Sequence, residues 1–304
     1  MVFRNSVEHG RKQNKMTKTI GFIGLGIMGE AMSTNLIKKS GCQIIVYDIV
    51  SEKIEALAKI GAKKAQSIKQ LSADSDIIIT MVPASEQAMQ VYNEIIKSMR
   101  KNTLCINMST IDPETHLEIV KLVEQKQGNI LDAPVVKSKA AAIGGKLGIY
   151  VGGRKEHFAE ALPILSCMGE QIKYMGSHGK GLYMKICHNM LVASIQNGVN
   201  EMLVMAKKAD LDIEEVIPAI SMGGGQNAYL DTKSNAILNE KYDPAFSIQN
   251  MHKDIHIAKR IAQNNGLILP ALDNSIKIYD QAIKKYASFD FSITYKVVKE
   301  NNDL

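Results

Sequence analysis

Three glycines and an acid near the start of the chain have the spacing of a dinucleotide-binding turn. Gly24, Gly26 and Gly29 follow an apolar, strand-like run at residues 19–23 and open a helical stretch. Such a turn needs a tight bend at the first glycine, close approach of a pyrophosphate at the second, and close helix packing at the third. Asp48 ends a second strand-like run, and its distance from the turn is near the roughly 20 positions expected for the acid that binds an adenine ribose diol.

These residues predict a nicotinamide cofactor. We expect its pyrophosphate to bind along one continuous segment, composed of Gly24, Leu25, Gly26, Ile27, Met28 and Gly29. NAD should be preferred over NADP, because the Asp48 carboxylate suits a ribose diol and repels a 2′-phosphate. Ile49 stands where an arginine often accommodates that phosphate, although Lys53 leaves NADP binding open.

Lys185 and Asn189 are candidates for acid–base chemistry. They begin a polar stripe that continues at Gln196 and Asn200 on a proline-free stretch, residues 181–208. On a helix these residues share one side, and a stripe of mostly neutral amides suits a buried polar cleft better than a solvated face. A lysine in a partly dry cleft can donate a proton to a carbonyl oxygen or accept one in the reverse reaction. Taken alone, however, a lysine on a helix is most often an exposed residue.

The elements that must position these groups fall into two parts. Short β-rich runs alternate with helical stretches up to about residue 176, which predicts a doubly wound parallel sheet with helices on both faces. The strand pattern then stops, and helical periods run to the C-terminus. We therefore expect a tail at residues 1–16, a Rossmann-type domain at 17–178, and an all-helical domain at 179–304 that includes a long interdomain helix.

Composition narrows the classes of function. The 304 residues are 45% hydrophobic, and no apolar run approaches the roughly 20 residues of a membrane span. The net charge of +6 is spread along the chain without interleaved aromatic residues, so we expect a small anionic ligand rather than nucleic acid or a membrane. Four scattered cysteines favour buried, reduced thiols. Residues 1–15 lack the apolar core of a secretory signal, and we expect a cytoplasmic protein.

Four ordered segments carry a family resemblance over residues 18 to about 290. They are the glycine turn at 24–29 with Met32, Asn35 and Leu36; Asp132 to Val135 with Gly145 and Leu147; Gly179 to Lys185 with Asn189; and Lys253 with Asp254. In these segments the chain resembles the β-hydroxyacid dehydrogenase family, which includes 3-hydroxyisobutyrate dehydrogenase and tartronate semialdehyde reductase.

The resemblance implies an NAD(P)-dependent enzyme that interconverts a small β-hydroxy acid and its semialdehyde or keto acid, in a homodimer or homotetramer. It implies Lys185 as the proton donor and acceptor, Asn189 as its partner, and Lys253 beside the cofactor. Further cofactor contacts are implied for Met81, Val82, Pro83, Thr110 and Phe246, and a loop near the nicotinamide for Ser109, which we take as a substrate contact. Ordinary strand-to-helix turns, and a core position for Phe246, remain alternatives.

Two departures from the family pattern concern the substrate. Val136, Lys137 and Ser138 stand where the family usually has Ser-Gly-Gly, a loop that holds the substrate carboxylate. Lys137 either binds a second or bulkier anionic group of the substrate or points into solvent. His188 stands where the family commonly has an asparagine, and either contacts the substrate or packs against a neighbouring helix.

Two other functions fit the same scaffold. One is a cofactor-binding regulator without turnover, against which Lys185 and Asn189 argue; the other is an imine reductase. We expect no metal. His252 and His256 have the i, i+4 spacing of a helical zinc pair, but the sequence offers no convincing third ligand.

Overall fold

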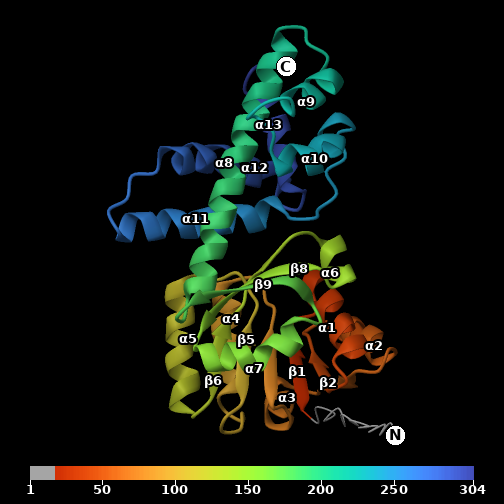
Figure 1. The fold of residues 1–304 in the computed structure, drawn as a ribbon, viewed down its shortest axis with the longest axis vertical. Coiled ribbons are helices and arrows are strands. Elements are labelled where there is room, and N and C mark those ends of the chain that lie inside the picture. The colour runs from red at the N-terminus through yellow and green to blue at the C-terminus, as the bar shows by residue number, and fades with distance from the viewer. Residues whose placement is uncertain (1–17) are drawn as a thin grey trace, which may run out of the picture.

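The computed structural model describes residues 18–304 as a sheet-based domain, a long helix and a helical domain (Figure 1). The predicted tail at residues 1–16 lies outside the described residues. The strands are β1 (Thr19–Ile23), β2 (Gln43–Tyr47), β3 (Lys63–Lys64), β4 (Ile77–Thr80), β5 (Leu104–Asn107), β6 (Asn129–Asp132), β7 (Val135–Val136), β8 (Leu147–Gly153) and β9 (Gly169–Gly176). The helices between them are α1 (Ile27–Lys39), α2 (Ser51–Ala58), α3 (Ile68–Asp74), α4 (Ser85–Ile95), α5 (Pro113–Gln125), α6 (Lys139–Gly144) and α7 (Lys155–Leu165).

The sheet is parallel only in its larger part. The strand order is β3-β2-β1-β4-β5-β6-β8, with β7 beside the start of β8 and β9 on its other edge. The strands from β3 to β6 are parallel, but β8 runs antiparallel to β6 and β7. The predicted parallel sheet is confirmed from β3 to β6 but does not extend to this edge, because an apolar strand pattern carries no information about strand direction.

The central strands are buried on both faces, as a doubly wound sheet requires. Within β4, Ile77 and Ile79 face one core cluster while Ile78 faces the other. Helices α1 and α7 pack on the first face, and α3, α4 and α5 pack on the second. This packing holds the strand ends at one edge, where the predicted site residues emerge.

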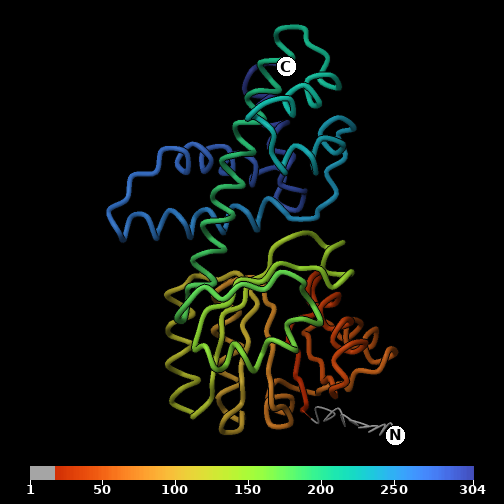
Figure 2. Tube along the Cα trace, viewed as in Figure 1, coloured from red at the N-terminus to blue at the C-terminus, as the bar shows by residue number. Residues whose placement is uncertain are grey.

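The helical part begins with α8 (Lys180–Lys208), a helix of 29 residues that rises from the sheet (Figures 1 and 2). It is followed by α9 (Ile213–Ile220), α10 (Ala228–Leu238), α11 (Ile248–Asn264), α12 (Pro270–Tyr286), the short 3-10 helix η1 (Phe291–Ile293) and α13 (Thr294–Glu300). These helices enclose a second core centred on α8, α11 and α12. In the described part of the chain, no helix is long and apolar enough to cross a membrane.

Helix α11 joins the helical domain to the strand-end edge of the sheet, and Figure 1 shows it between that edge and α12. The Lys253 ammonium donates a hydrogen bond to the carbonyl oxygen of Thr110. About two helical turns further along α11, Arg260 donates a hydrogen bond to the Asp112 carboxylate, with Nε 2.9 Å from Oδ2. The two domains thus meet through polar contacts at the end of β5.

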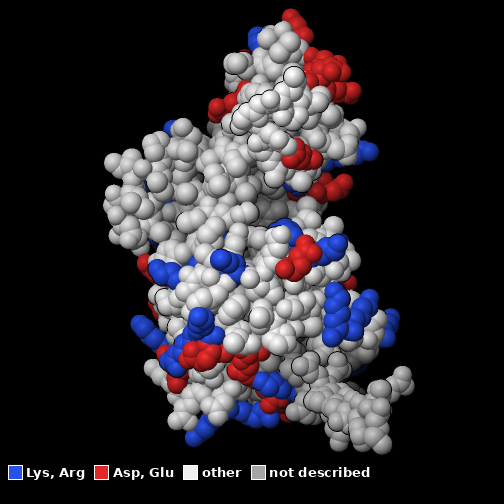
Figure 3. All heavy atoms as spheres, viewed as in Figure 1, with Lys and Arg blue, Asp and Glu red and all other residues white. Residues whose placement is uncertain are grey.

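The surface agrees only in part with the expectations from composition. On the face drawn in Figure 3, basic and acidic side chains are interspersed over the N-terminal domain, so this face has no continuous basic track. Cys105 and Cys167 are buried free thiols as predicted, but Cys187 is exposed. It lies on the side of α8 that faces away from the buried Lys185 and Asn189.

Candidate active site

The three glycines of the turn differ in the space around them. Gly24 has a φ of +93°, and a Cβ atom there would lie 2.2 Å from the carbonyl oxygen of Met81. At Gly29 a Cβ atom would lie 1.9 Å from the carbonyl oxygen of Gly24. At Gly26, in contrast, a Cβ atom would meet nothing within 4 Å. Two glycines are thus needed by the fold, whereas the open space at Gly26 is available to a ligand.

The start of α1 is also suited to an anion. Gly26 caps this helix and contributes no side-chain hydrogen bond, so the first backbone N–H groups are available to phosphate oxygens. Leu25 is fully buried beneath the turn, while Ile27 is 53% exposed. These features fit the pyrophosphate of a dinucleotide.

Asp48 lies beside the turn, directly after β2. Its Oδ2 accepts a hydrogen bond from Leu25 N at 2.6 Å, and its Oδ1 accepts one from Val50 N at 2.9 Å. The carboxylate therefore braces the glycine turn, a role that the sequence did not predict. Two carboxylate oxygens offer about four lone-pair positions, so lone pairs remain for a ribose diol.

A hydrogen bond joins the loop after β4 to the loop after β5. Ser109 is fully buried, and its hydroxyl accepts a hydrogen bond from Val82 N at 2.9 Å. The neighbouring Met81 lies against Gly24, while Pro83 is exposed. Ser109 thus braces a loop in this structure; the predicted substrate contact would need its hydroxyl to turn away from Val82.

Lys185 lies on the first turns of α8 with a side chain that is almost fully buried. Only 7% of the residue is exposed, and its ammonium lies 5.7 Å from the centre of the Phe246 ring. Burial lowers the pKa of Lys185 to about 8. The Asp254 carboxylate acts in the opposite direction and raises the pKa, whereas the Lys253 charge lowers it further. Such a group can exchange a proton near neutral pH.

Asp254 connects the remaining polar groups around Lys185. This carboxylate is 1% exposed, accepts a hydrogen bond from Asn189 Nδ2 at 2.6 Å and forms an ion pair with Lys253 at 2.8 Å. Lys253 in turn reaches Thr110 across the domain boundary. The sequence places Asp254 in a family motif but gives it no role, because its partner Asn189 lies far away in the chain.

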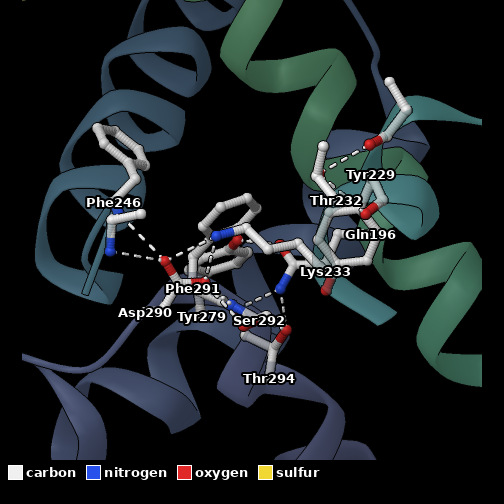
Figure 4. A network of polar contacts seen from close by, with 12 residues as sticks. Gln196, Tyr229, Thr232, Lys233, Phe246, Tyr279, Asp290, Phe291, Ser292 and Thr294 are labelled. Carbon is white, nitrogen blue, oxygen red and sulfur yellow. Dashed lines mark hydrogen bonds and ion pairs between the residues drawn. The ribbon is translucent and has the colours of Figure 1, made fainter. Parts of the chain in front are cut away.

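The Phe246 ring is positioned by Asp290. The Asp290 carboxylate accepts hydrogen bonds from the backbone N–H groups of Ala245 and Phe246, each at 3.1 Å, and from Lys233 at 2.9 Å (Figure 4). This buried acid fixes the loop that carries Phe246 beside Lys185. No feature of the sequence predicted it.

His188, one residue before Asn189, also lies near Lys185. Burial and the Lys185 charge lower the pKa of His188 to about 4, so its imidazole is neutral at physiological pH. Its ring centre is 6.2 Å from that of Tyr150 on β8. Neutral imidazole can both donate and accept a hydrogen bond.

The polar groups of the Val136–Ser138 segment contact residues other than Lys185. Lys137 has a φ of +84°, at the position where the family usually has a glycine. Its ammonium forms an ion pair with Glu170 at 3.0 Å, and Ser138 caps α6 through a bond from Ala141 N. Within residues 18–304, no hydrogen bond or ion pair joins Val136, Lys137 or Ser138 to Lys185.

The predicted polar stripe of α8 divides between two environments. Lys185 and Asn189 lie at the interdomain site, but Gln196 donates a hydrogen bond to Thr294 inside the helical domain (Figure 4). Asn200 donates a hydrogen bond to the same Thr294 hydroxyl. Gln196 also accepts a hydrogen bond from Tyr279. The expectation of one continuous polar cleft is therefore wrong, because the second half of the stripe is used to hold α13 against α8.

Asp132 anchors the start of α8. Its two carboxylate oxygens accept hydrogen bonds from Gly179 N at 2.8 Å and Leu182 N at 2.9 Å. Burial acts to raise the pKa of the Asp132 carboxyl, but His116 and these two amides outweigh it, and the pKa is lowered. An ionised carboxylate at a helix N-terminus is favourable, and here it holds the helix that carries Lys185.

The open space at Gly26 gives a direct test of cofactor binding. We expect Gly26→Ala to weaken cofactor binding at least tenfold, about 1.4 kcal/mol, because the new methyl group occupies the approach of the pyrophosphate. The melting temperature should change little, since the methyl group meets no protein atom. Gly198→Ala is the matched control, because Gly198 lies on α8 and a Cβ atom there would also meet nothing within 4 Å. Calorimetric titration with cofactor checks both, and an unchanged Kd for Gly26→Ala would contradict this placement.

Comparison with known proteins agrees with this geometry. A family profile described as the NAD binding domain of 6-phosphogluconate dehydrogenase matches residues 19–176. A second, described as NAD-binding of NADP-dependent 3-hydroxyisobutyrate dehydrogenase, matches residues 179–298. Mouse mitochondrial 3-hydroxyisobutyrate dehydrogenase is 34% identical over 294 residues, covering 92% of this chain and 87% of its own. The chain belongs to the β-hydroxyacid dehydrogenase family.

Two further relatives extend this membership. The uncharacterized oxidoreductase YkwC of Bacillus subtilis is 35% identical, over 88% of this chain and 93% of its own. The solved structure of 3-hydroxyisobutyrate dehydrogenase from Mycobacterium tuberculosis, with L-serine, superposes with a TM-score of 0.87 at 29% identity, covering 93% of this chain and all of that one. As a member of this family, the protein is an NAD(P)-dependent oxidoreductase that acts on CH–OH groups.

Proposed function

We propose that this enzyme interconverts a small β-hydroxy acid and its semialdehyde or keto acid, with Lys185 as the proton donor and acceptor. The observation that supports this proposal best is the Lys185 ammonium, which lies 5.7 Å from the centre of the Phe246 ring and whose pKa is lowered to about 8 by burial. A group with such a pKa can both give and take a proton near neutral pH.

A nicotinamide held at this site would supply the hydride chemistry, at the carbon that carries the reacting oxygen. In the oxidative direction, neutral Lys185 accepts the hydroxyl proton of the substrate. In the reductive direction, protonated Lys185 donates a proton to the carbonyl oxygen. Asn189 and Asp254 hold this part of α8 against α11, and the Phe246 ring keeps water from one side of the ammonium.

The proposed substrate carries a carboxylate. The two lysines Lys185 and Lys253 outnumber the one carboxylate at this site, that of Asp254, so an anionic substrate is favoured over a neutral one. The relative from Mycobacterium tuberculosis was solved with L-serine, an acid whose hydroxyl group is β to its carboxyl. His188, which is neutral beside Lys185, is our first candidate for a substrate contact. Lys137 would contact a substrate only after leaving Glu170.

We further propose NAD as the preferred cofactor, held by the glycine turn, Asp48 and the loops at 81–83 and 109–110, with Phe246 and Lys253 facing it from the helical domain. Asp48 supports this preference by its position directly after β2, and the neighbouring Ile49 is 92% exposed and offers no cation to a 2′-phosphate. A homodimer or homotetramer remains part of the proposal.

The pH dependence of turnover tests the role of Lys185. Because its pKa is lowered to about 8, kcat/KM for oxidation of a small β-hydroxy acid should rise through about pH 8 as the amine loses its proton. For reduction of the matching semialdehyde, kcat/KM should fall through the same range. Steady-state assays in both directions at saturating cofactor measure the two limbs. Limbs with the same sign in both directions would contradict proton transfer by Lys185.

A further inference from the structure

A second group of polar side chains lies on the α11–α12 hairpin, outside the site described above. His252 and His256 on α11 both direct Nε2 at the same carboxylate oxygen, Oδ1 of Asp280 on α12. The two distances are 2.8 Å and 3.0 Å, and the imidazole centres are 4.2 Å apart. Asp280 is a candidate third ligand, which the sequence did not reveal because it lies on the next helix.

The donor atoms have the spacing of a small metal site. One atom from each of the three residues lies within 4.8 Å of the other two. In a tetrahedral zinc site with bonds of about 2.0–2.1 Å, ligand atoms are about 3.3 Å apart. The observed separations from each Nε2 to Oδ1, 2.8 Å and 3.0 Å, are about 0.3 to 0.5 Å shorter than that value, so the side chains would move slightly apart to admit an ion.

The charge of the group also suits a divalent cation. The Asp280 carboxylate lies 2.8 Å and 3.0 Å from the two imidazole nitrogens, and an aspartate carboxylate carries a negative charge at neutral pH. A neutral imidazole coordinates a metal through its unprotonated ring nitrogen, so a cation bound to both Nε2 atoms would need each histidine to carry its proton on Nδ1. The Asp280 side chain is 49% exposed, which leaves access for the ion and for water as a fourth ligand.

We propose that His252, His256 and Asp280 form a binding site for Zn²⁺ or a similar divalent transition-metal ion, which clips α11 to α12. The site has no part in hydride transfer. At 100° per residue, Asp254 lies about 200° around α11 from His252, so the active-site carboxylate and the metal ligands occupy opposite sides of this helix. The bound ion would stabilise the hairpin that positions Lys253 and Asp254.

The alternative is that the three residues are only a hydrogen-bonded brace between the helices. A brace stabilises the hairpin without metal, and its removal lowers stability to the same extent with or without zinc. A metal site instead makes the melting temperature depend on zinc, since ligand binding to the folded state stabilises it. The two readings therefore differ in a measurable way.

The experiment is a calorimetric titration of the chelator-treated full chain with Zn²⁺, followed by thermal melts with and without zinc. We expect one ion per chain at this site and a higher melting temperature with zinc. In His256→Gln the affinity for zinc should fall about 100-fold or more, and zinc should no longer raise the melting temperature. Asp280→Asn should weaken binding about tenfold, because two imidazoles remain. His157→Gln, outside the cluster, is the matched control and should bind zinc as the unmodified chain does.

A second polar group, His116, Asp132 and His178, also has ligand-like spacing, so His178→Gln controls for its contribution and should leave the binding unchanged. Three results would overturn the proposal: no Zn²⁺ binding with a Kd below about 100 µM, equal affinity in the unmodified chain and His256→Gln, or equal affinity in the unmodified chain and Asp280→Asn. Circular dichroism of each variant establishes that it is folded, and His252→Gln replaces any variant that is not.

Discussion

Replacement of Lys185 by methionine should lower turnover by about 10² to 10⁴, the usual contribution of a positioned general acid or base. The methionine side chain fills a similar volume beside Phe246 but cannot exchange a proton. Cofactor affinity should barely change, because Lys185 is proposed to meet only the reacting oxygen. Stopped-flow measurement of the hydride-transfer step, with cofactor affinity determined separately by titration, checks both expectations.

The same substitution should make the protein more stable at neutral pH. The pKa of Lys185 is lowered to about 8 from an ordinary 10.5, so the folded state disfavours the charged form. That cost is fully present below about pH 8 and disappears as the pH rises toward the ordinary value. At pH 7 methionine removes it, and the free energy of unfolding should rise by up to about 3 kcal/mol.

Lys180→Met is the matched control for Lys185→Met. Lys180 lies on the same helix but is exposed, with its ammonium 5.3 Å from the centre of the Tyr183 ring. We expect little change in turnover or stability for this variant. Near-normal turnover in Lys185→Met, or an equal loss in Lys180→Met, would remove Lys185 from the mechanism.

Asp48→Asn should weaken NAD binding by about 1.5 to 3 kcal/mol, the contribution of a hydrogen bond to a charged group, which corresponds to about 10- to 150-fold in Kd. Binding of NADP should weaken less or improve, because the carboxylate that repels a 2′-phosphate is gone. The ratio of kcat/KM for NAD to kcat/KM for NADP measures this change.

Asp48 also supports the glycine turn, and the experiment must separate this structural role from cofactor selection. Its carboxylate also holds Leu25 N and Val50 N, so loss of the turn would weaken both cofactors equally. Glu52→Gln, at an exposed acid in the first turn of α2, controls for the general effect of removing a negative charge nearby. Higher efficiency with NADP in the unmodified protein would show that Asp48 does not select NAD.

The parts of the fold that depend on local pattern could be predicted from the sequence. The apolar run at residues 19–23 was predicted with the bounds observed for β1, since a buried strand has a nearly continuous apolar sequence. The reversal at β8 could not be predicted, because strand direction depends on the connection through α6 and not on hydrophobicity. The two-residue strands β3 and β7 are too short to have a pattern at all.

The site shows the same limit. Gly24 and Gly29 follow from backbone sterics that any such turn imposes, and they were predicted. Asp254 and Asp290 were not given roles, because each acts on a partner distant in the chain: Asn189 in the first case and the backbone of Phe246 in the second. The polar stripe of α8 was interpreted as one cleft, since helical periodicity cannot tell which neighbour covers each turn.

The most direct test of this account is the rate of nicotinamide reduction with a panel of small β-hydroxy acids, measured with NAD and with NADP. The panel includes acids with a second carboxylate or a phosphate, and amines as comparison substrates. We predict turnover with at least one β-hydroxy acid, a higher kcat/KM with NAD, and loss of that turnover in Lys185→Met. Turnover with amines alone, or none with any hydroxy acid although the cofactor binds, would contradict the proposed function.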